Sequence, residues 1–377
     1  MIDILQIDPQ NRYFRNLFLE FPFQLYKNIP QWVPPLAVDA NRMLDQRRNP
    51  FFEHGRAAFF LALDAQRIPL GRVAVLDNDN YNQHNHERTA FFYLFECINN
   101  PEVSQALFEC VFSWVRSQRL NKVIGPKGFT VLDGLGMLVK GFEHRPAFGL
   151  PYNPPYYPSM VESAGFVPSG EMVSGYMSSH MAFPEKIHQI SELVQKRRGM
   201  RVISFRNRLD FKKHIPSLQA LYNASLEGTT GNIPLTPNDV KTLANQLLWF
   251  ADPKLIKIIM KDDNPVGFLL AYPDISAAVQ RSKGRLFPFG WLRLLVETKK
   301  TRWVNINGAA IVEKYRGLGG TAILFSEMYK SILKGKFEHA DIVQIGVENE
   351  KMQLELRNLG IDFYKTHRLY QRDLLNK

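Results

Sequence analysis

Hydrophobic and polar positions follow two periods along the chain, and each period predicts one kind of element. Apolar runs rich in β-branched and aromatic residues predict strands, and a polar turn within such a run predicts a hairpin. By this criterion, hairpins are expected at residues 57–76 and 254–272, and single strands at 89–98, 303–312 and 340–347. Apolar residues at every third or fourth position predict helices at residues 101–118, 156–166, 184–198, 211–226, 236–250 and 348–360. The first 55 residues and the polar segment 77–88 follow neither period and are expected to be irregular.

A weak internal repeat relates the two halves of the chain. Pro-Leu-Gly occurs in the first predicted hairpin at residues 69–71, and Pro-Val-Gly occurs in the second at residues 265–267. A short predicted helix ends at Gly165 in the first half and at Gly360 in the second, 96 and 95 residues after the respective prolines. A chain of 377 residues suits two domains of about 190 residues each, so the repeat predicts two copies of one α/β unit.

Composition and charge narrow the setting and the partners. Hydrophobic residues make up 45% and charged residues 22% of the chain, which is ordinary for a soluble globular protein. No basic stretch followed by an apolar core opens the sequence, and its apolar runs are shorter than the about 20 residues of a membrane span. The two cysteines, Cys97 and Cys110, do not suggest a disulfide framework, so a reducing, cytoplasmic setting is expected. The net charge of +11 favours an anionic partner: a phosphorylated cofactor, nucleic acid or an acidic lipid surface.

The most informative motif is the turn Tyr-Arg-Gly-Leu-Gly-Gly at residues 315–320. It follows a predicted strand that ends at Ile311 and Val312, and an amphipathic helical pattern begins directly after it. Glycines at such a place let the backbone approach a ligand, and the first N–H groups of the helix suit phosphate oxygens. Arg316 adds a positive charge. The pattern predicts a phosphate-binding turn, although a purely structural glycine-rich turn shares it.

A dinucleotide-binding fold is a third interpretation, because Gly317-x-Gly319-x-x-Ala322 matches the G-x-G-x-x-A fingerprint. The surrounding sequence argues against it. Only 55 residues follow Ala322, and the acidic residue expected about 20 residues further on comes late, at Glu348.

The succession of strand, glycine turn, helix, strand and a short helix that opens with Asn349 resembles the GNAT acyltransferases. Their signature, Q/R-x-x-G-x-G/A, cradles the pyrophosphate of acetyl-CoA. Arg316 and Gly319 match this signature, and Thr321 takes the final Gly/Ala place. The resemblance implies that acyl-CoA is bound by Ile311, Val312, Arg316, Gly317, Leu318, Gly319, Gly320, Thr321 and Asn349.

The resemblance also implies the fold class: an α/β chain of two tandem GNAT-like lobes, each a mixed twisted sheet flanked by helices. The expected lobes are residues 1–180 and residues 181–377, and only the second carries the acyl-CoA motif. The first is a degenerate copy, because its strand passes through Asn99 and Asn100 into a helix without the glycine turn.

Further segments narrow the resemblance. WVPP, NPFFEH, GPKGF, YNPPYY and GRLFPFG, spread over nearly the whole chain, resemble a group of large two-lobed bacterial GNAT-like proteins. Related members take part in bacterial ceramide synthesis by acylating a long-chain amine. The implied activity is transfer of an acyl group from acetyl-CoA, or a longer acyl-CoA, to a small-molecule or lipid amine, without a metal. A non-catalytic GNAT-derived binding module is the alternative.

Acyl transfer to an amine needs a proton acceptor for the amine and a proton for the departing thiolate. In many GNAT enzymes a tyrosine seven residues after the Asn of the last helix supplies that proton, but Leu356 stands at this position. Tyr364 and Tyr370 on the final predicted strand are candidate substitutes, and Asp274 is the candidate general base.

Asn305 and Asn307 alternate with apolar residues on the strand before the turn. Since successive side chains of a strand point to opposite faces, both asparagines are expected on one side of the sheet. They either line the acceptor cleft or form hydrogen bonds on an ordinary polar face.

The segment between the second hairpin and the strand at 303–312 mixes apolar and basic residues. Its large apolar side chains are Leu286, Phe287, Phe289, Trp291, Leu292, Leu294 and Leu295. Such a segment either lies at a membrane surface or forms a buried helix between the lobes. Peripheral membrane contact through residues 284–296, by a cytoplasmic and membrane-associated protein, is therefore one of two interpretations.

Other patterns carry less weight. His84 and His86 lie in a polar segment without an acidic or cysteine partner at metal spacing, and Cys110 lies in an apolar helical pattern that favours packing. The basic run at residues 196–198 suits a helix end, whereas nucleic-acid binding would need more such clusters with interleaved aromatic residues. Neither a metal nor nucleic acid is an expected partner.

Overall fold

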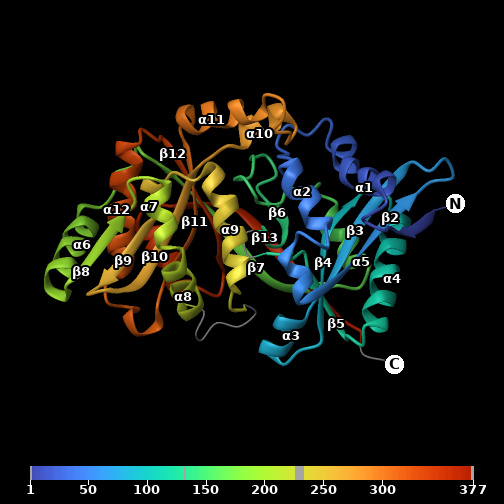
Figure 1. Cartoon of the computed structure of the whole chain (residues 1–377), viewed down its shortest axis with the longest axis horizontal. Coiled ribbons are helices and arrows are strands. Elements are labelled where there is room, and N and C mark those ends of the chain that lie inside the picture. Colours follow the sequence, from blue (N-terminus) through green and yellow to red (C-terminus); the bar gives the residue numbers. More distant parts are fainter. Residues whose placement is uncertain (1, 131–132, 226–232, 375–377) are drawn as a thin grey trace. The chain divides into compact units, whose positions relative to one another are not determined.

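The computed structural model describes residues 2–130, 133–225 and 233–374, which form two compact α/β units (Figure 1). The first unit comprises Met1–Val173, Val279–Trp291 and Lys365–Lys377, and the second comprises Ser174–Ala278 and Leu292–Tyr364. The first unit therefore takes in two later segments of the chain, which a single boundary at residue 180 does not provide for. Strands β7 (Val167–Ser178) and β13 (Asp362–Asp373) each contribute residues to both units.

The sheet of the first unit has the strand order β1-β2-β3-β4-β5-β13, with β6 paired to β13. Its other strands are β1 (Asp3–Gln6), β2 (Gly55–Leu63), β3 (Pro69–Asn78), β4 (Thr89–Cys97), β5 (Lys122–Gly125) and β6 (Met137–Lys140). β2 and β3 form the first predicted hairpin and are antiparallel. β4 and β5 are parallel, as a connection through helix α4 (Pro101–Ser117) allows.

Two helices cover opposite faces of this sheet. α4 begins after Asn100, whose side chain accepts a hydrogen bond of 2.9 Å from the amide of Glu102. It packs on the face that holds Phe60, whereas Phe59 packs edge to face against Phe18 of α1 (Arg12–Leu25), with 5.7 Å between ring centroids. The alternation of side chains along β2 thus buries both faces. The other helices are α2 (Ala37–Leu44), α3 (Asp79–Asn85) and α5 (Tyr157–Ser163).

Two segments that were expected to be irregular contain regular structure. α1 begins after Asn11, whose side chain caps the first turn, and it continues through Pro22. α3 is short and polar, and the side chain of Asn78 caps it. The expectation for residues 1–55 and 77–88 is therefore wrong in these stretches. An internal proline hides the first helix from a periodicity argument, and capping, not an apolar stripe, marks the second.

The sheet of the second unit has the order β7-β12-β11-β10-β9-β8. Its strands besides β7 are β8 (Met200–Ser204), β9 (Lys257–Lys261), β10 (Asn264–Pro273), β11 (Trp303–Ile311) and β12 (His339–Gly346). β9 and β10 form the second predicted hairpin, and β11 and β12 are parallel. The helices are α6 (Glu185–Arg198), α7 (Arg208–Lys213), α8 (Ile215–Ser225), α9 (Pro237–Phe250), α12 (Gly320–Lys334) and α13 (Glu350–Asn358).

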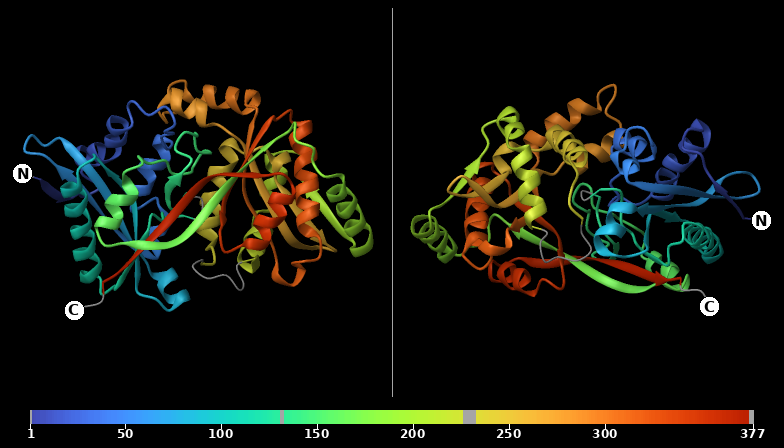
Figure 2. Two further views of the ribbon diagram at one scale, coloured as in Figure 1. Left: turned by 180° about the vertical axis from the view of Figure 1, so that it is seen from behind. Right: turned by 60° about the horizontal axis from the view of Figure 1, so that its bottom comes forward.

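One face of the second sheet is apolar. Val304 and Ile306 of β11 and Ala340 and Ile342 of β12 belong to a buried core that α12 completes. α6 packs beside α12 (Figure 2). Alternate residues of the same strands, among them Asn305 and Asp341, therefore point to the opposite face.

The remaining helices, α10 (Ser276–Ser282) and α11 (Gly290–Lys300), lie in the segment between β10 and β11. Within the described residues, none of the helices combines the length and the apolar character that crossing a membrane requires.

Phe108 of α4 anchors the aromatic core of the first unit. It is fully buried, and its ring centroid lies 5.4 Å from that of Phe92, 4.8 Å from Phe95 and 5.0 Å from Phe166. Because rigid rings cannot close the space, Phe108→Ala should lower the free energy of unfolding by about 3–5 kcal/mol in denaturant titrations. Tyr13→Ala, whose ring is 60% exposed, should cost less than about 0.5 kcal/mol. Equal losses would mean that the core collapses around the missing ring.

Candidate functional site

β11 and β12 pair only over their first halves. Their parallel register ends at Ile306 opposite Ile342, whereas β11 continues to Ile311 and β12 to Gly346. On its other side, β11 stays paired with β10 as far as Ile311 opposite Gly267. Among the described residues, the end of β11 therefore has a strand partner on one side only. On the other side, beyond Ile306, its N–H and C=O groups do not pair with β12.

The predicted glycine turn follows β11 directly. Gly317 and Gly319 have φ angles of 74° and 89°, which favour glycine. A Cβ atom on Gly319 would lie 2.6 Å from Val194, whereas one on Gly317 would meet only the Lys351 ammonium, at 3.8 Å. Gly319 thus permits close packing between the turn and α6, and Gly317 keeps an exposed stretch of backbone open.

The helix that follows the turn begins without a side-chain cap. Gly319 is the N-cap residue of α12 and, as a glycine, has no side chain that could cap the first amides of the helix. These N–H groups and the helix dipole form a positive end. Lys314, Arg316 and Lys351 add full charges around the turn. The arrangement suits phosphate oxygens.

Arg316 also holds the turn in place. Its Nε donates to the carbonyl oxygen of Ile311 at 3.1 Å, and its Nη2 donates to that of Ser225 at 3.0 Å. The side chain is exposed, so it remains within reach of a ligand while it ties the end of β11 to the end of α8. The predicted signature arginine therefore has a structural contact set as well as a charge.

The predicted cofactor-binding residues 311–321 form one continuous strand end, turn and helix start. Gly320 is buried against Ile311. The Val312 amide donates a hydrogen bond of 3.0 Å to the carbonyl oxygen of Val266 on β10. Asn349 lies apart in sequence at the start of α13, where its side chain accepts from the amide of Met352 at 3.2 Å. A ligand-binding role for these residues stays a prediction.

A buried polar network lies on the other face of the sheet. Asp274 is 4% exposed, and its Oδ1 accepts from the Ser276 hydroxyl at 2.6 Å and from Asn305 Nδ2 at 3.1 Å. Asn305 is itself 1% exposed and lies opposite Asp341 in the β11–β12 register. Asn307 donates to the Tyr272 hydroxyl at 3.0 Å. Both asparagines share one face, as predicted, but Asn305 is enclosed by hydrogen bonds.

Tyr364 joins this network from β13. Burial raises its pKa well above the ordinary value for tyrosine, and the charge of Asp341 and a hydrogen bond to it raise the pKa further. Asp274 and Tyr176 add to the same shift. The structure thus brings together two of the three residues that the sequence nominates for catalysis, Asp274 and Tyr364. Their catalytic role stays a prediction.

The other tyrosine candidate lies elsewhere. Tyr370 is fully buried in the first unit, and its hydroxyl donates to Glu162 at 3.4 Å. Leu356, at the place of the family tyrosine, is also fully buried, within the apolar core of the second unit.

Comparisons with known proteins agree with this architecture. No family model matches the chain. It is 27% identical to Protein YghO of Escherichia coli K12 over 364 residues, covering 95% of this chain and 92% of that protein. It is 24% identical to the bacterial ceramide synthase of Caulobacter vibrioides over 372 residues, covering 95% and 94%. A solved tandem GNAT protein from the clavulanic acid biosynthesis pathway matches with a TM-score of 0.57 at 10% identity, covering 100% of both chains.

The chain has the tandem GNAT fold. In each GNAT-like unit a strand leads through a turn into a helix, and the chain returns in a parallel strand: β4, α4 and β5 in the first, and β11, α12 and β12 in the second. The expected fold class is confirmed.

In the first GNAT unit, side chains occupy the backbone groups at the equivalent strand end. The parallel register of this unit ends at Phe91 opposite Ile124, and β4 runs on to Cys97. There the amide of Cys97 donates to the Tyr157 hydroxyl at 2.7 Å, and the Tyr156 hydroxyl donates to the Cys97 carbonyl oxygen at 2.9 Å. Side chains of the protein thus take the backbone groups at the end of β4.

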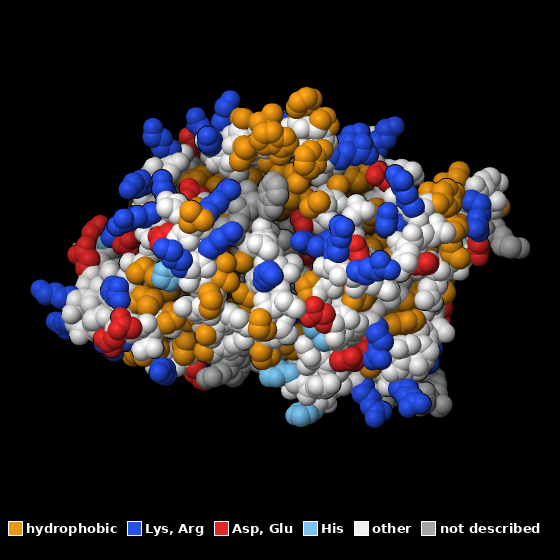
Figure 3. Space-filling model, viewed as in Figure 1, with side chains coloured by type: hydrophobic (Ala, Val, Ile, Leu, Met, Phe, Trp, Pro, Cys, Tyr) orange, Lys and Arg blue, Asp and Glu red, His pale blue; other side chains and the backbone are white. Residues whose placement is uncertain are grey.

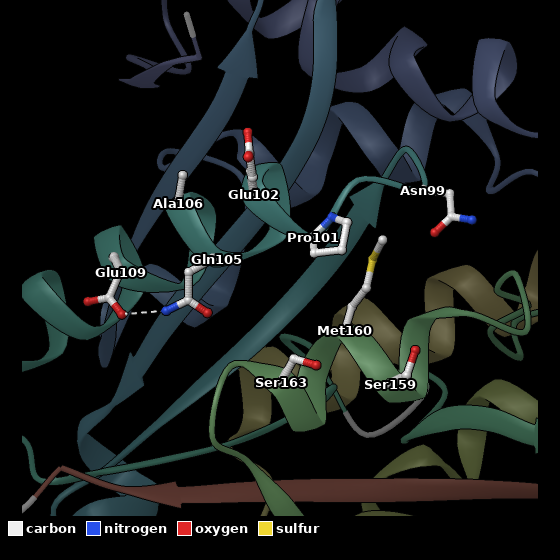
Figure 4. Close-up of a pocket in the computed structure, with 9 residues that line it drawn as sticks. All are labelled: Asn99, Pro101, Glu102, Gln105, Ala106, Glu109, Ser159, Met160 and Ser163. Carbon is white, nitrogen blue, oxygen red and sulfur yellow. Dashed lines mark hydrogen bonds between the residues drawn. The ribbon is translucent and has the colours of Figure 1, made fainter.

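The start of α4 also differs from that of α12. The Asn100 side chain already occupies the Glu102 amide. A groove of about 560 Å³ lies between α4 and α5 (Figure 4). Glu102 and Glu109 line it, with a hydrogen bond of 2.8 Å from Gln105 to Glu109. Carboxylates and a capped helix start do not suit a pyrophosphate.

Sequence reasoning missed several members of the polar network. Asp341 stands between two apolar residues of β12, as Asn305 does on β11. The alternation of polar and apolar residues could therefore have identified it. Tyr272 and Ser276 had no local signal, because their partners lie on other strands or in a tight turn.

The raised pKa of Tyr364 has a consequence for alkaline stability. The fold favours the neutral phenol, so its contribution to stability is present below the unfolded pKa of about 10 and is lost as the pH rises further. Above pH 10 the wild type should therefore lose up to about 1.4 kcal/mol more per pH unit than Tyr364→Phe. Urea titrations between pH 9 and pH 11 measure the difference. Identical slopes would mean that Tyr364 ionises equally easily in both states.

Proposed function

We propose that the protein is an N-acyltransferase that moves an acyl group from acyl-CoA to an amine. The observation that carries the proposal is found in the second unit. There, β11 continues beyond its pairing with β12 and leads into a glycine turn with basic residues around it. The helix that follows, α12, begins without a side-chain cap. The GNAT fold and the similarity to a protein named as a ceramide synthase support the acyltransferase class.

The donor would bind along residues 311–321. The part of β11 beyond Ile306, which does not pair with β12, suits the amide groups of the pantetheine arm, and the turn with the start of α12 suits the pyrophosphate. Lys314, Arg316 and Lys351 would offset the phosphate charge.

The acceptor proposal rests on the polar face. The charges of two buried carboxylates, Asp274 and Asp341, raise the pKa of Tyr364. The same negative field favours a cation beside Tyr364. An alkylammonium fits that charge. The named relative adds the class, since ceramide synthesis acylates a lipid amine. We therefore propose a long-chain or other lipid amine, with a small soluble amine as the simpler case.

In the proposed reaction, the ammonium first gives up a proton, and we assign its acceptance to the carboxylate network that includes Asp274. The amine nitrogen then attacks the thioester carbonyl carbon, a C–N bond forms and the C–S bond breaks. The nitrogen loses its second proton as the thiolate leaves and takes up a proton, so the products are an amide and free CoA. Tyr364 stays protonated at neutral pH, and we propose that its hydroxyl donates a hydrogen bond to the departing thiolate.

One observation favours a second candidate function, a non-catalytic acyl-CoA or lipid-binding module. Leu356 occupies the place of the family's proton-donating tyrosine, and it is buried in the core. A binding module would retain ligand affinity without turnover.

Turnover separates the two functions. The purified protein is incubated with acetyl-CoA or a long-chain acyl-CoA, with and without a long-chain amino alcohol, and the amide product is measured by mass spectrometry. The enzyme should form amide and release free CoA only when both are present. Acyl-CoA binding by calorimetry without product would select the binding module, and no CoA binding at all would overturn both.

Arg316→Ala tests the donor site. Loss of a charged hydrogen bond of about 1.5–3 kcal/mol should weaken acyl-CoA binding roughly ten- to 150-fold. Arg316→Lys keeps the charge but cannot reproduce the contacts to Ile311 and Ser225, so it separates charge from turn geometry. Arg201→Ala removes an exposed arginine elsewhere in the second unit and should leave affinity unchanged. Wild-type affinity in Arg316→Ala would remove this residue from the site.

A further inference from the structure

The segment 283–300, which we call the apolar cap, exposes large hydrophobic side chains in a continuous run of sequence. Six of them are exposed: Phe287 at 79%, Phe289 at 67%, Trp291 at 39%, Leu292 at 43%, Leu295 at 41% and Val296 at 48%. Hydrophobic side chains gather over α10 and α11 in Figure 3. The interpretation of this segment as a buried helix is therefore wrong for these side chains, although Leu286 and Leu294 are buried.

The exposed residues of α11 share one face. Trp291, Leu292, Leu295 and Val296 stand at i, i+1, i+4 and i+5, which at 3.6 residues per turn lie within less than half of the helix circumference. Leu294 points away from that face and is 9% exposed. α11 is therefore amphipathic, with its broad apolar face toward solvent, the reverse of an ordinary surface helix.

The loop before α11 holds its two phenylalanines outward. The Trp291 amide donates to the Leu286 carbonyl oxygen at 2.9 Å, and Trp291 Nε1 donates to that of Pro288 at 3.1 Å. The Gly284 carbonyl oxygen accepts from the Ala37 amide at 2.9 Å. Hydrogen bonds at both ends of the loop thus fix it while Phe287 and Phe289 remain exposed.

The charge around the apolar cap has one dominant sign. Between residues 281 and 302 the sequence has seven basic residues and one acidic residue, Glu297. Lys299 lies two turns beyond Trp291 and Leu292, on the same side of α11, and Arg293 and Lys300 lie along one edge of the apolar face. All three are exposed. Arg285 lies 3.6 Å from Glu20, in an exposed ion pair.

Exposed aromatic rings with cations beside them are the side chains that bind an anionic bilayer surface. Rings and leucines enter the boundary between headgroups and acyl chains, and lysine and arginine meet the lipid phosphates. We propose that the apolar cap docks the protein on an anionic membrane surface. The inference rests on exposure and charge alone, and it holds whether or not the second unit transfers acyl groups.

Vesicle flotation tests the proposal without any substrate. The full chain is mixed with vesicles of phosphatidylcholine alone, or of phosphatidylcholine with about one third anionic phosphatidylglycerol. The wild type should float with the anionic vesicles and release at high salt. Phe287→Ser/Phe289→Ser should reduce the partition coefficient about tenfold or more. Because both side chains are exposed, this variant should retain the wild-type circular dichroism and melting temperature.

Two further variants make the test specific. Val167→Ser/Leu209→Ser removes side chains that are 55% and 73% exposed outside the apolar cap, and it should bind vesicles as the wild type does. Lys299→Glu/Lys300→Glu should weaken binding to anionic vesicles and leave the weak binding to neutral vesicles unchanged.

Three outcomes would overturn the proposal. The first is no flotation of the wild type, and the second is equal flotation of the wild type and Phe287→Ser/Phe289→Ser. The third is a wild-type dimer in light scattering that this variant converts to a monomer, because the apolar cap would then bind a second copy of the chain. Acylation of a soluble amine, measured in parallel, should be equal in both proteins. Its absence would rule out the soluble amine as acceptor and leave the docking result intact.

Discussion

The early end of the pairing between β11 and β12 is the constraint on which the second unit depends. Two parallel strands in register to their ends would satisfy the backbone groups between them and leave no room for a guest. Because the register ends at Ile306, the rest of β11 does not pair with β12, and the chain then turns into α12. The glycines, the cations and the uncapped helix start follow directly on this unpaired strand end.

The first unit also has a strand that extends beyond its parallel partner, but there side chains bind the unpaired backbone groups. β4 also outruns its parallel partner, but the hydroxyls of Tyr156 and Tyr157 satisfy the backbone at Cys97, and Asn100 caps the helix that follows. Equivalent strand geometry is therefore followed by a glycine turn in the second unit and by an Asn-capped helix start in the first. The difference lies in a few side chains at the strand end, not in the fold.

The periodic parts of the fold could be predicted from the sequence, because local patterns determine them. Both hairpins and the strand–turn–helix around residues 303–334 are where alternation and glycine spacing place them. Partners far away in sequence could not be predicted. The sequence predicts that Asn305 and Asn307 share a face, but the hydrogen bond of Asn305 to Asp274, which lies 31 residues earlier in the chain directly after β10, has no local signal. Similarly, the apolar run around Phe287 has the same local pattern whether or not something covers it.

The tyrosine closure of the first unit makes the two units respond differently to their surroundings. In the first unit the hydroxyls of Tyr156 and Tyr157 occupy the strand end permanently, because they are part of the chain. The stability of this unit therefore does not depend on the concentration of a ligand at that position. A guest that arrives from solution stabilises its host by mass action, more strongly as its concentration rises. If acyl-CoA is that guest, the supply of acyl donor in the cell sets the stability of one half of the molecule and leaves the other half unchanged.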